Sequence, residues 1–110
     1  MVITDTVGGV IDRWLCFHYD MRDDVLYLRS AAHPETPSFG EETADGLILL
    51  RDADTDEPLG LTVVSWLKRS GRADMPDSLD ALGRLIESDA KQLSARVGLE
   101  APASEPVTAG

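Results

Sequence analysis

Cysteine is nearly absent from this sequence. The single cysteine, Cys16, excludes an intramolecular disulfide and a zinc site built from several thiolates. Basic residues are also few: 10 Lys and Arg stand against 20 Asp and Glu, which gives a net charge of −10. A chain this acidic repels nucleic-acid phosphates and anionic membrane surfaces, so we expect it to bind neither.

Long apolar segments are missing as well. No apolar run approaches the roughly 18 residues that a membrane-spanning helix needs. Residues 1–5 (MVITD) have no basic segment and lead into no long apolar stretch, so they do not resemble a signal peptide. We therefore expect a cytoplasmic protein.

The sequence also lacks the motifs of common catalytic and nucleotide-binding sites. No serine lies in a G-x-S-x-G turn, and Gly8-Gly9 is too short for a phosphate-binding loop. No cofactor is expected, and a binding protein is favoured over an enzyme.

What is present predicts one domain with an ordinary hydrophobic core, because 110 residues with 43% hydrophobic content suffice for that. Alternating apolar residues at 13–20 and 25–30 predict two strands joined as an antiparallel hairpin. Residues 46–50 and 59–67 predict a second hairpin around an acidic turn. The apolar residues at 47–50 do not alternate, so we expect that strand to be central or covered on both faces.

A C-terminal helix over about 76–97 is predicted by apolar residues at helical spacing, from Leu79 to Val97. Pro76 suits its first turn, and Gly98 suits the left-handed residue that ends it. Residues 1–12 form a lead-in or a short extra strand, 31–45 a long surface loop, and 99–110 a disordered tail. The predicted fold class is α+β: residues 13–98 form a four-stranded, mainly antiparallel sheet of two hairpins, with this amphipathic helix packed on one face.

Two groups of side chains could bind a metal ion. Cys16, His18 and Asp20 share one face of a strand, but adjacent same-face residues lie about 7 Å apart, which is too far for three ligands to hold one ion. The turn at 52–56 begins like a calcium loop with alternating aspartates, but Glu57 occupies the position that requires glycine. We expect no metal site, and a solvated hairpin turn at 52–56.

A carboxylate pair, Asp20 and Asp24, flanked by Tyr19 and Tyr27, could carry out acid–base chemistry. Aspartates that bracket a tight turn more often accept hydrogen bonds from backbone N–H groups. The structural role is therefore favoured for this corner. The small basic cluster Lys68, Arg69 and Arg72 is expected to pair with acids on the protein's own surface.

The same corner resembles a known family. Tyr19-Asp20, three residues, Asp24, one residue and Leu26-Tyr27-Leu28 are similar to the Tyr-Asp-x-x-x-Asp-x-Leu-Tyr-Ile motif of the DUF2283 family of small prokaryotic proteins. Further similarity lies in a glycine-led apolar strand, an acidic turn and a second glycine-led strand, so that the resemblance covers roughly residues 14–67. The positions that match the family are Tyr19, Asp20, Asp24, Leu26, Tyr27, Gly46, Asp52 and Gly60.

The resemblance implies a small stand-alone domain without an established activity, sometimes encoded beside toxin-like proteins. The leading hypothesis is a non-enzymatic protein-association module, either a homodimer or the partner of a basic, toxin-like protein. The alternative is a small enzyme at the Tyr19, Asp20, Asp24 and Tyr27 corner. A ligand or metal sensor that uses Cys16, His18 and Asp20 is a further alternative.

Overall fold

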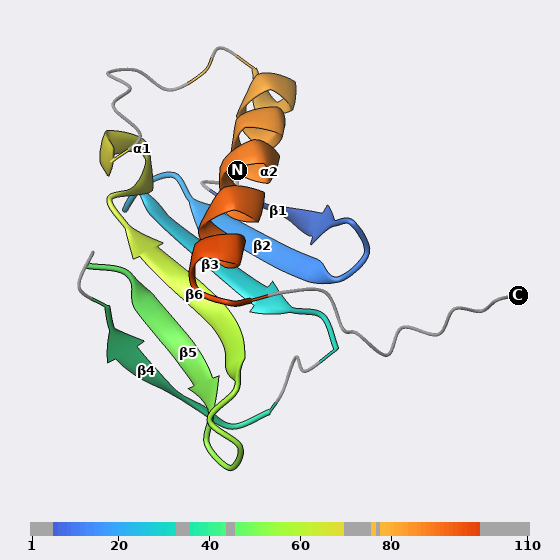
Figure 1. Cartoon of the computed structure of the whole chain (residues 1–110). Helices are drawn as coiled ribbons and strands as arrows, with labels where there is room; N and C mark the ends of the chain where they lie inside the picture. The colour runs from blue at the N-terminus through green and yellow to red at the C-terminus, as the bar shows by residue number, and fades with distance from the viewer. Residues whose placement is uncertain (1–5, 33–35, 44–45, 70–75, 77, 100–110) are drawn as a thin grey trace, which may run out of the picture.

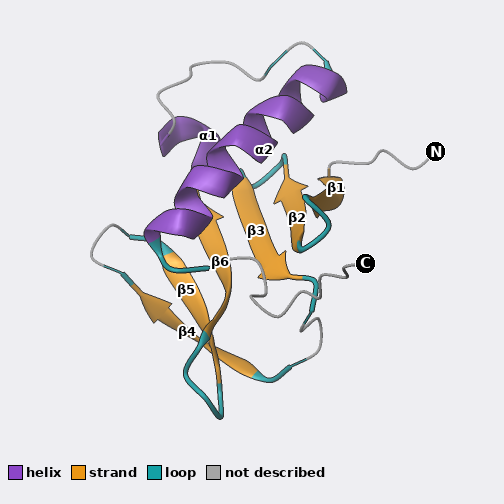
Figure 2. Ribbon diagram, turned by 45° about the vertical axis from the view of Figure 1, so that its right-hand side comes forward, coloured by secondary structure: helices purple, strands orange, loops and turns teal. Residues whose placement is uncertain are grey.

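A six-stranded, fully antiparallel sheet forms the centre of the computed structural model, which describes residues 6–32, 36–43, 46–69, 76 and 78–99. Helix α2 crosses one face of this sheet, and the short helix α1 lies beside it (Figures 1 and 2). The architecture is therefore α+β, as the sequence predicts. The elements are β1 (Thr6–Ile11), β2 (Leu15–Asp20), β3 (Val25–Ser30), β4 (Ser38–Glu42), β5 (Ile48–Asp52), β6 (Pro58–Val64), α1 (Trp66–Arg69) and α2 (Leu79–Arg96).

The predicted number of four strands is wrong, because β1 and β4 add one strand at each edge of the sheet, although an extra strand within residues 1–12 is one of the two predicted alternatives. Strand β1 pairs with β2 along its whole length, but Gly8 and Gly9 interrupt its apolar pattern. Strand β4 lies inside the predicted loop at 31–45, and all five of its residues are exposed. An edge strand of this kind is held by backbone hydrogen bonds to its neighbour and needs no hydrophobic alternation.

The strand order, β1-β2-β3-β6-β5-β4, divides the sheet into two three-stranded meanders. Each meander runs through consecutive strands, and the two meet where β3 pairs with β6. Opposite positions on this seam include Leu28 with Leu61 and Arg29 with Gly60. The two predicted hairpins thus become the inner strand pairs of one continuous sheet.

The chain leaves β6 earlier than predicted. The expected strand at 59–67 ends at Val64, and Ser65 takes a left-handed conformation with φ of 59°. Trp66 then begins α1 instead of continuing the strand. The turn lets the indole of Trp66 enter the core, where the residue is only 1% exposed.

Helix α2 begins three residues after the predicted start. Ser78 is its N-cap, and the Ser78 hydroxyl accepts a hydrogen bond from the backbone N–H of Ala81 at 3.1 Å. Pro76 therefore lies before the helix, and Leu79, counted in the predicted apolar stripe, is 65% exposed. Gly98 has φ of 81° and follows the helix as a left-handed residue, as predicted.

The hydrophobic core lies between α2 and the sheet. Leu82, Ile86 and Ala90 of α2 are fully or almost fully buried, as are Leu26 and Leu28 of β3 and Leu61 and Val63 of β6. Strand β5 lies inside the sheet, between β4 and β6, but the prediction of two covered faces does not hold. Leu49 is buried on the helix side, whereas Ile48 and Leu50 on the opposite side are only half-buried. The expected tail at 99–110 lies almost wholly outside the described residues.

Candidate functional site

The hydroxyl of Tyr19 donates a hydrogen bond to Oδ1 of Asp24 at 2.6 Å. Tyr19 is fully buried, and its ring meets that of Trp66 edge to face with centroids 5.0 Å apart. Burial, and then the hydrogen bond to the Asp24 carboxylate, raise the pKa of the Tyr19 hydroxyl well above its ordinary value. The corner therefore holds a neutral phenol whose proton is committed to Asp24.

Asp24 also caps α1, a helix more than 40 positions away in the sequence. Its two carboxylate oxygens accept from the backbone N–H groups of Leu67 and Lys68 at 2.8 and 3.3 Å. Its backbone carbonyl accepts from the N–H of Trp66 at 3.0 Å. Asp24 itself has φ of 57°, a conformation that Asp and Asn tolerate better than most residues. The first hairpin and the end of β6 are thereby joined by one side chain.

The remaining residues of the corner have separate positions. Asp20 accepts from the backbone N–H groups of Arg22 and Asp23 through Oδ1, as an aspartate in a turn commonly does. Leu26 is buried under α2, whereas Tyr27 projects from the opposite face and is 44% exposed. Tyr19, Asp20, Asp24 and Tyr27 therefore do not surround a common cleft, and the first three serve the turn and the cap.

Three further positions of the family-like pattern take part in turns and close packing. Gly46 has φ of 83°, and a Cβ there would lie 2.5 Å from the Arg69 guanidinium. The Asp52 carboxylate accepts from the backbone N–H groups of Asp54 and Thr55, which makes the acidic segment a hairpin turn, as expected. Gly60 lies so close to β3 that a Cβ would overlap the carbonyl oxygen of Leu28.

Cys16, His18 and Asp20 do lie on one face of β2, as the alternation predicts. The His18 ring contacts that of Tyr27 across the strand pair, with centroids 5.8 Å apart. Among the described residues, no group of three His, Cys, Asp or Glu side chains is arranged to hold a metal ion.

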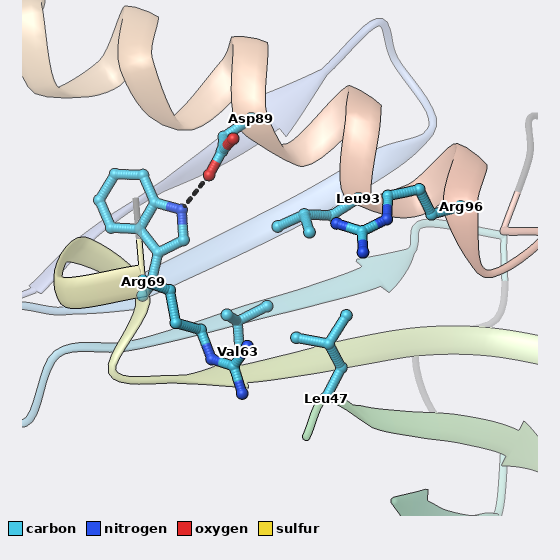
Figure 3. Close-up of a pocket in the computed structure, with 7 residues that line it drawn as sticks. Leu47, Val63, Arg69, Asp89, Leu93 and Arg96 are labelled. Carbon is cyan, nitrogen blue, oxygen red and sulfur yellow. Dashed lines mark hydrogen bonds between the residues drawn. The ribbon is translucent and has the colours of Figure 1, made fainter. Parts of the chain in front are cut away.

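A cavity of about 170 Å³ lies between α1, α2 and the adjoining end of the β5–β6 hairpin (Figure 3). Its apolar wall consists of Leu47, Val63, Leu93 and Trp66, all at most 9% exposed. Its polar lining is Arg69 from α1 together with Asp89 and Arg96 from α2.

Two hydrogen bonds orient the polar groups of this cavity. The indole N–H of Trp66 donates to Oδ2 of Asp89 at 2.6 Å, which ties α1 to α2. Nε of Arg69 donates to the carbonyl oxygen of Val64 at 3.1 Å. The lining thus combines two guanidinium groups and one carboxylate with an apolar wall.

The sequence does not reveal this cavity. Arg69 is assigned there to a surface cluster whose third member, Arg72, lies outside the described residues. Trp66 is assigned to a strand, and Asp89 and Arg96 are separated from it by at least 23 positions. One observation could have pointed to it: Asp89 and Arg96 lie seven residues apart, which places them on one side of a helix.

The sheet face opposite α2, here called the open face, is covered by neither described helix (Figure 2). It carries Val10, Tyr27 and Val64, which are 57%, 44% and 45% exposed, and half-buried Val25, Ile48 and Leu50. The strand registers place Val10 next to Cys16, and Val64 next to Val25. The apolar side chains of β3, β6 and β5 therefore adjoin one another on this face, whereas Cys16 and His18 of β2 separate Val10 from them.

The chain matches no protein-family model, no curated protein and no solved structure. The resemblance of residues 14–67 to the DUF2283 family stays a prediction. Within the part of the chain that is described, neither helix has the length and apolar character to span a membrane.

Proposed function

We propose that this chain is a non-enzymatic protein-association module that pairs with a second copy of itself through the open face. The observation that carries the proposal is the exposure of Val10, Tyr27 and Val64 on one side of a sheet whose other side is filled by α2. Exposed apolar side chains that adjoin one another mark interaction surfaces more often than isolated ones do.

The shape of the open face suits packing against a flat surface. Gly8, Gly40 and Gly60 take positions on it in β1, β4 and β6. A Cβ at Gly40 would lie 3.0 Å from a methyl carbon of Ile48, and one at Gly60 would lie 3.3 Å from a methyl carbon of Leu50. The side chains of β5 thus lie over the neighbouring glycines of β4 and β6, which makes this part of the open face nearly flat.

The size of the open face fits a weak, reversible dimer. Six strands at about 4.8 Å spacing and five residues at about 3.4 Å give an outline of about 24 by 17 Å, or about 400 Å². Two such faces bury an area within the class of transient complexes, which stay below about 1,200 Å² in total. We therefore expect a dissociation constant on the order of 0.1 mM.

The distribution of charge favours a second copy over a basic partner. The acids on the open face, Asp20 and Glu42, lie at strand ends, whereas Arg29 lies in the row between Cys16 and Gly60. Most described acids instead belong to hairpin turns and to α2. A basic protein would find little complementary charge on this face, whereas a second apolar face would find an equivalent surface.

The test is sedimentation equilibrium of the whole chain from about 10 µM to about 1 mM, a range that brackets the expected constant. Val64→Lys and Tyr27→Lys should each weaken dimerisation at least tenfold, because they bury a charge in the contact. Leu79→Lys is the matched control: it makes the same charge change at an exposed apolar residue away from the open face, and it should leave the constant unchanged.

Salt dependence gives a second readout. Two copies that each carry −10 repel one another, so higher salt should strengthen an apolar dimer by screening that repulsion. A chain that stays monomeric at about 1 mM, or a dimer that Leu79→Lys disrupts as strongly as Val64→Lys, would contradict the proposal. Dimerisation that weakens as salt rises would contradict it too, since such a contact depends on opposite charges.

A further inference from the structure

We infer that the free edge of β4 binds an extended, basic peptide segment of a partner protein as an additional antiparallel strand of the sheet. In strand addition, backbone hydrogen bonds provide the affinity and neighbouring side chains provide the specificity. The site is the outer edge of the sheet and not its open face, so the inference does not depend on the proposed dimer.

The direction of the β4 backbone groups follows from the pairing of β4 with β5. In an antiparallel pair, successive residues of an inner strand direct their N–H and C=O groups alternately to one neighbour and to the other. The N–H of Ala53 donates to the carbonyl oxygen of Pro37 at 3.0 Å, and the N–H of Thr43 donates to that of Leu47 at 2.7 Å. Both bonds continue the β4–β5 register, so the odd-numbered residues of β4 are the ones that bond to β5.

The even-numbered residues of β4 therefore direct their N–H and C=O groups away from the sheet. These residues are Ser38, Gly40 and Glu42, and no described strand lies beyond them (Figures 1 and 2). All three are exposed, and their outward backbone groups form no hydrogen bond with another described residue. An added strand would pair with these donors and acceptors as β5 pairs with those on the other side.

The charge near this edge selects a basic partner. The described residues between 36 and 64 include six acids and one base. The base, Arg51, already donates through Nε to Oε1 of Glu41 at 2.7 Å. Glu42, in contrast, forms an ion pair with no described residue, although its backbone lies on the free edge. A lysine or arginine opposite Glu42 would form a favourable cross-strand pair.

The other side of β4 offers a neighbour for an apolar side chain. Phe39 is 44% exposed and lies opposite Arg51, on the side of the sheet that carries α2. Aromatic and β-branched residues on adjacent strands stabilise a sheet when they lie opposite one another. The edge thus fits a strand in which basic or polar residues alternate with β-branched ones.

The same charges disfavour pairing between two copies of β4. Such pairing would bring together two acidic edges of chains that each carry −10. Charged side chains on an edge strand are a common protection against association of this kind. The edge is therefore unfavourable for a like-charged strand but favourable for a basic one.

The experiment is a titration of the ¹⁵N-labelled whole chain, at about 50 µM, with the end-capped heptapeptide KVTVTVK, followed by amide NMR. This concentration lies below the dissociation constant expected for the dimer. We expect saturable shifts with a dissociation constant on the order of 1 mM, because a short peptide loses conformational freedom on binding. Amide exchange should slow about tenfold at about 10 mM peptide for Ser38, Gly40 and Glu42. It should change much less for Phe39 and Glu41, whose N–H groups already bond to β5.

Two control peptides separate charge from strand formation. The acidic peptide EVTVTVE should bind at least about tenfold more weakly, because like charges repel at this edge. The peptide KVPVPVK keeps both lysines but lacks two N–H donors and cannot form a regular strand, so it should also bind at least about tenfold more weakly.

Matched variants of the chain test the acid on the edge. Glu42→Lys should weaken KVTVTVK binding at least about fivefold, because it replaces an attractive cross-strand pair with a repulsive one. Asp23→Lys makes the same charge reversal at an exposed residue of the β2–β3 turn, and it should leave the constant within about twofold.

Three results would each overturn the inference. The first is the absence of shifts at β4 up to about 10 mM KVTVTVK, or slowed exchange at β1 without any at β4. The second is equal binding of KVPVPVK or of EVTVTVE, which would show that strand pairing or charge is not recognised. The third is an equal loss in Asp23→Lys, which would show only a general effect of net charge. None of these results bears on the dimer, because sedimentation of the open-face variants tests a different surface.

Discussion

Tyr19 and Asp24 show how one hydrogen bond can join distant parts of a small fold. The phenol donates to a carboxylate that also caps α1, so the hairpin turn and the chain after β6 share one acceptor. A neutral donor to a charged acceptor is among the stronger hydrogen bonds in proteins. Both residues of the family-like corner thus take part in hydrogen bonds that hold the fold together.

Replacing Tyr19 with phenylalanine should lower the free energy of unfolding by about 1–2 kcal/mol at pH 7, because the half-buried Asp24 carboxylate loses a donor. Urea denaturation at fixed protein concentration measures the change. Tyr27→Phe is the control: its exposed hydroxyl should contribute less than about 0.5 kcal/mol. Equal stability of Tyr19→Phe and the wild type would show that the bond adds nothing.

The raised pKa of Tyr19 also predicts that the stability difference between the wild type and Tyr19→Phe depends on pH. The pKa of Tyr19 is raised in the folded state, so above about pH 10 the unfolded state releases this proton while the folded state keeps it. The stabilisation is complete below the ordinary pKa and is lost as pH rises above it, by at most about 1.4 kcal/mol per pH unit. The stability difference between wild type and Tyr19→Phe should therefore shrink from pH 9 to pH 11, in contrast to a constant difference if the phenol were unperturbed.

Helix α2 is the element on which the core depends, and its N-cap serine differs in environment from the two serines inside the helix. Ser78 caps the helix, Ser88 is exposed, and Ser94 is 2% exposed with no hydrogen-bond partner for its hydroxyl among the described residues. A buried hydroxyl without a hydrogen-bond partner destabilises the folded state, whereas a capping hydroxyl stabilises it.

Replacing serine with alanine should therefore change the stability of the protein in opposite directions at Ser78 and at Ser94. Ser78→Ala should destabilise the protein by about 1 kcal/mol through loss of the cap. Ser94→Ala should stabilise it by about 0.5–1.5 kcal/mol, since alanine removes the unsatisfied oxygen and favours the helix. Ser88→Ala, the exposed control, isolates the helix preference at about 0.5 kcal/mol or less. Urea midpoints of the three variants check this order, and destabilisation by Ser94→Ala would mean that its hydroxyl is bonded.

At the scale of the whole molecule, the sheet is two meanders joined along a single seam between β3 and β6. Gly60 lies on that seam opposite Arg29, where the β3 backbone leaves no space for a Cβ atom on β6. Buried residues of both seam strands, from β3 and from β6, belong to the same core cluster as Leu82, Ile86 and Ala90 of α2. Pairing at the seam and burial under α2 thus depend on each other.

Adding one methyl group should have opposite effects at two glycines. Gly60→Ala should destabilise the protein by more than about 2 kcal/mol, because the Cβ overlaps the Leu28 carbonyl and the β3–β6 seam must shift. Gly83→Ala in α2 should stabilise it by about 0.5–1 kcal/mol, because no atom lies within 4 Å of the added Cβ and alanine favours a helix. Thermal and urea unfolding of both variants measure the effects. A Gly60→Ala protein as stable as the wild type would show that the seam tolerates displacement.

The sequence by itself determined the elements whose residues bury one face. Alternation located β2 and β3, and helical spacing located α2, because in each case burial against the core imposes the period of the element on its residues. The left-handed Gly98 and the acidic turn at Asp52 were also predictable, since both are local preferences of the backbone.

Only the tertiary structure decided the features that depend on partners distant in the sequence. Strand β4 is exposed on both faces and exists through pairing with β5, so its residues carry no period. Asp24 caps a helix that begins 42 positions later, and the cavity joins Trp66 to Asp89 and Arg96. Such contacts depend on how the elements pack against one another. A local sequence pattern reflects only the environment of the one element that contains it.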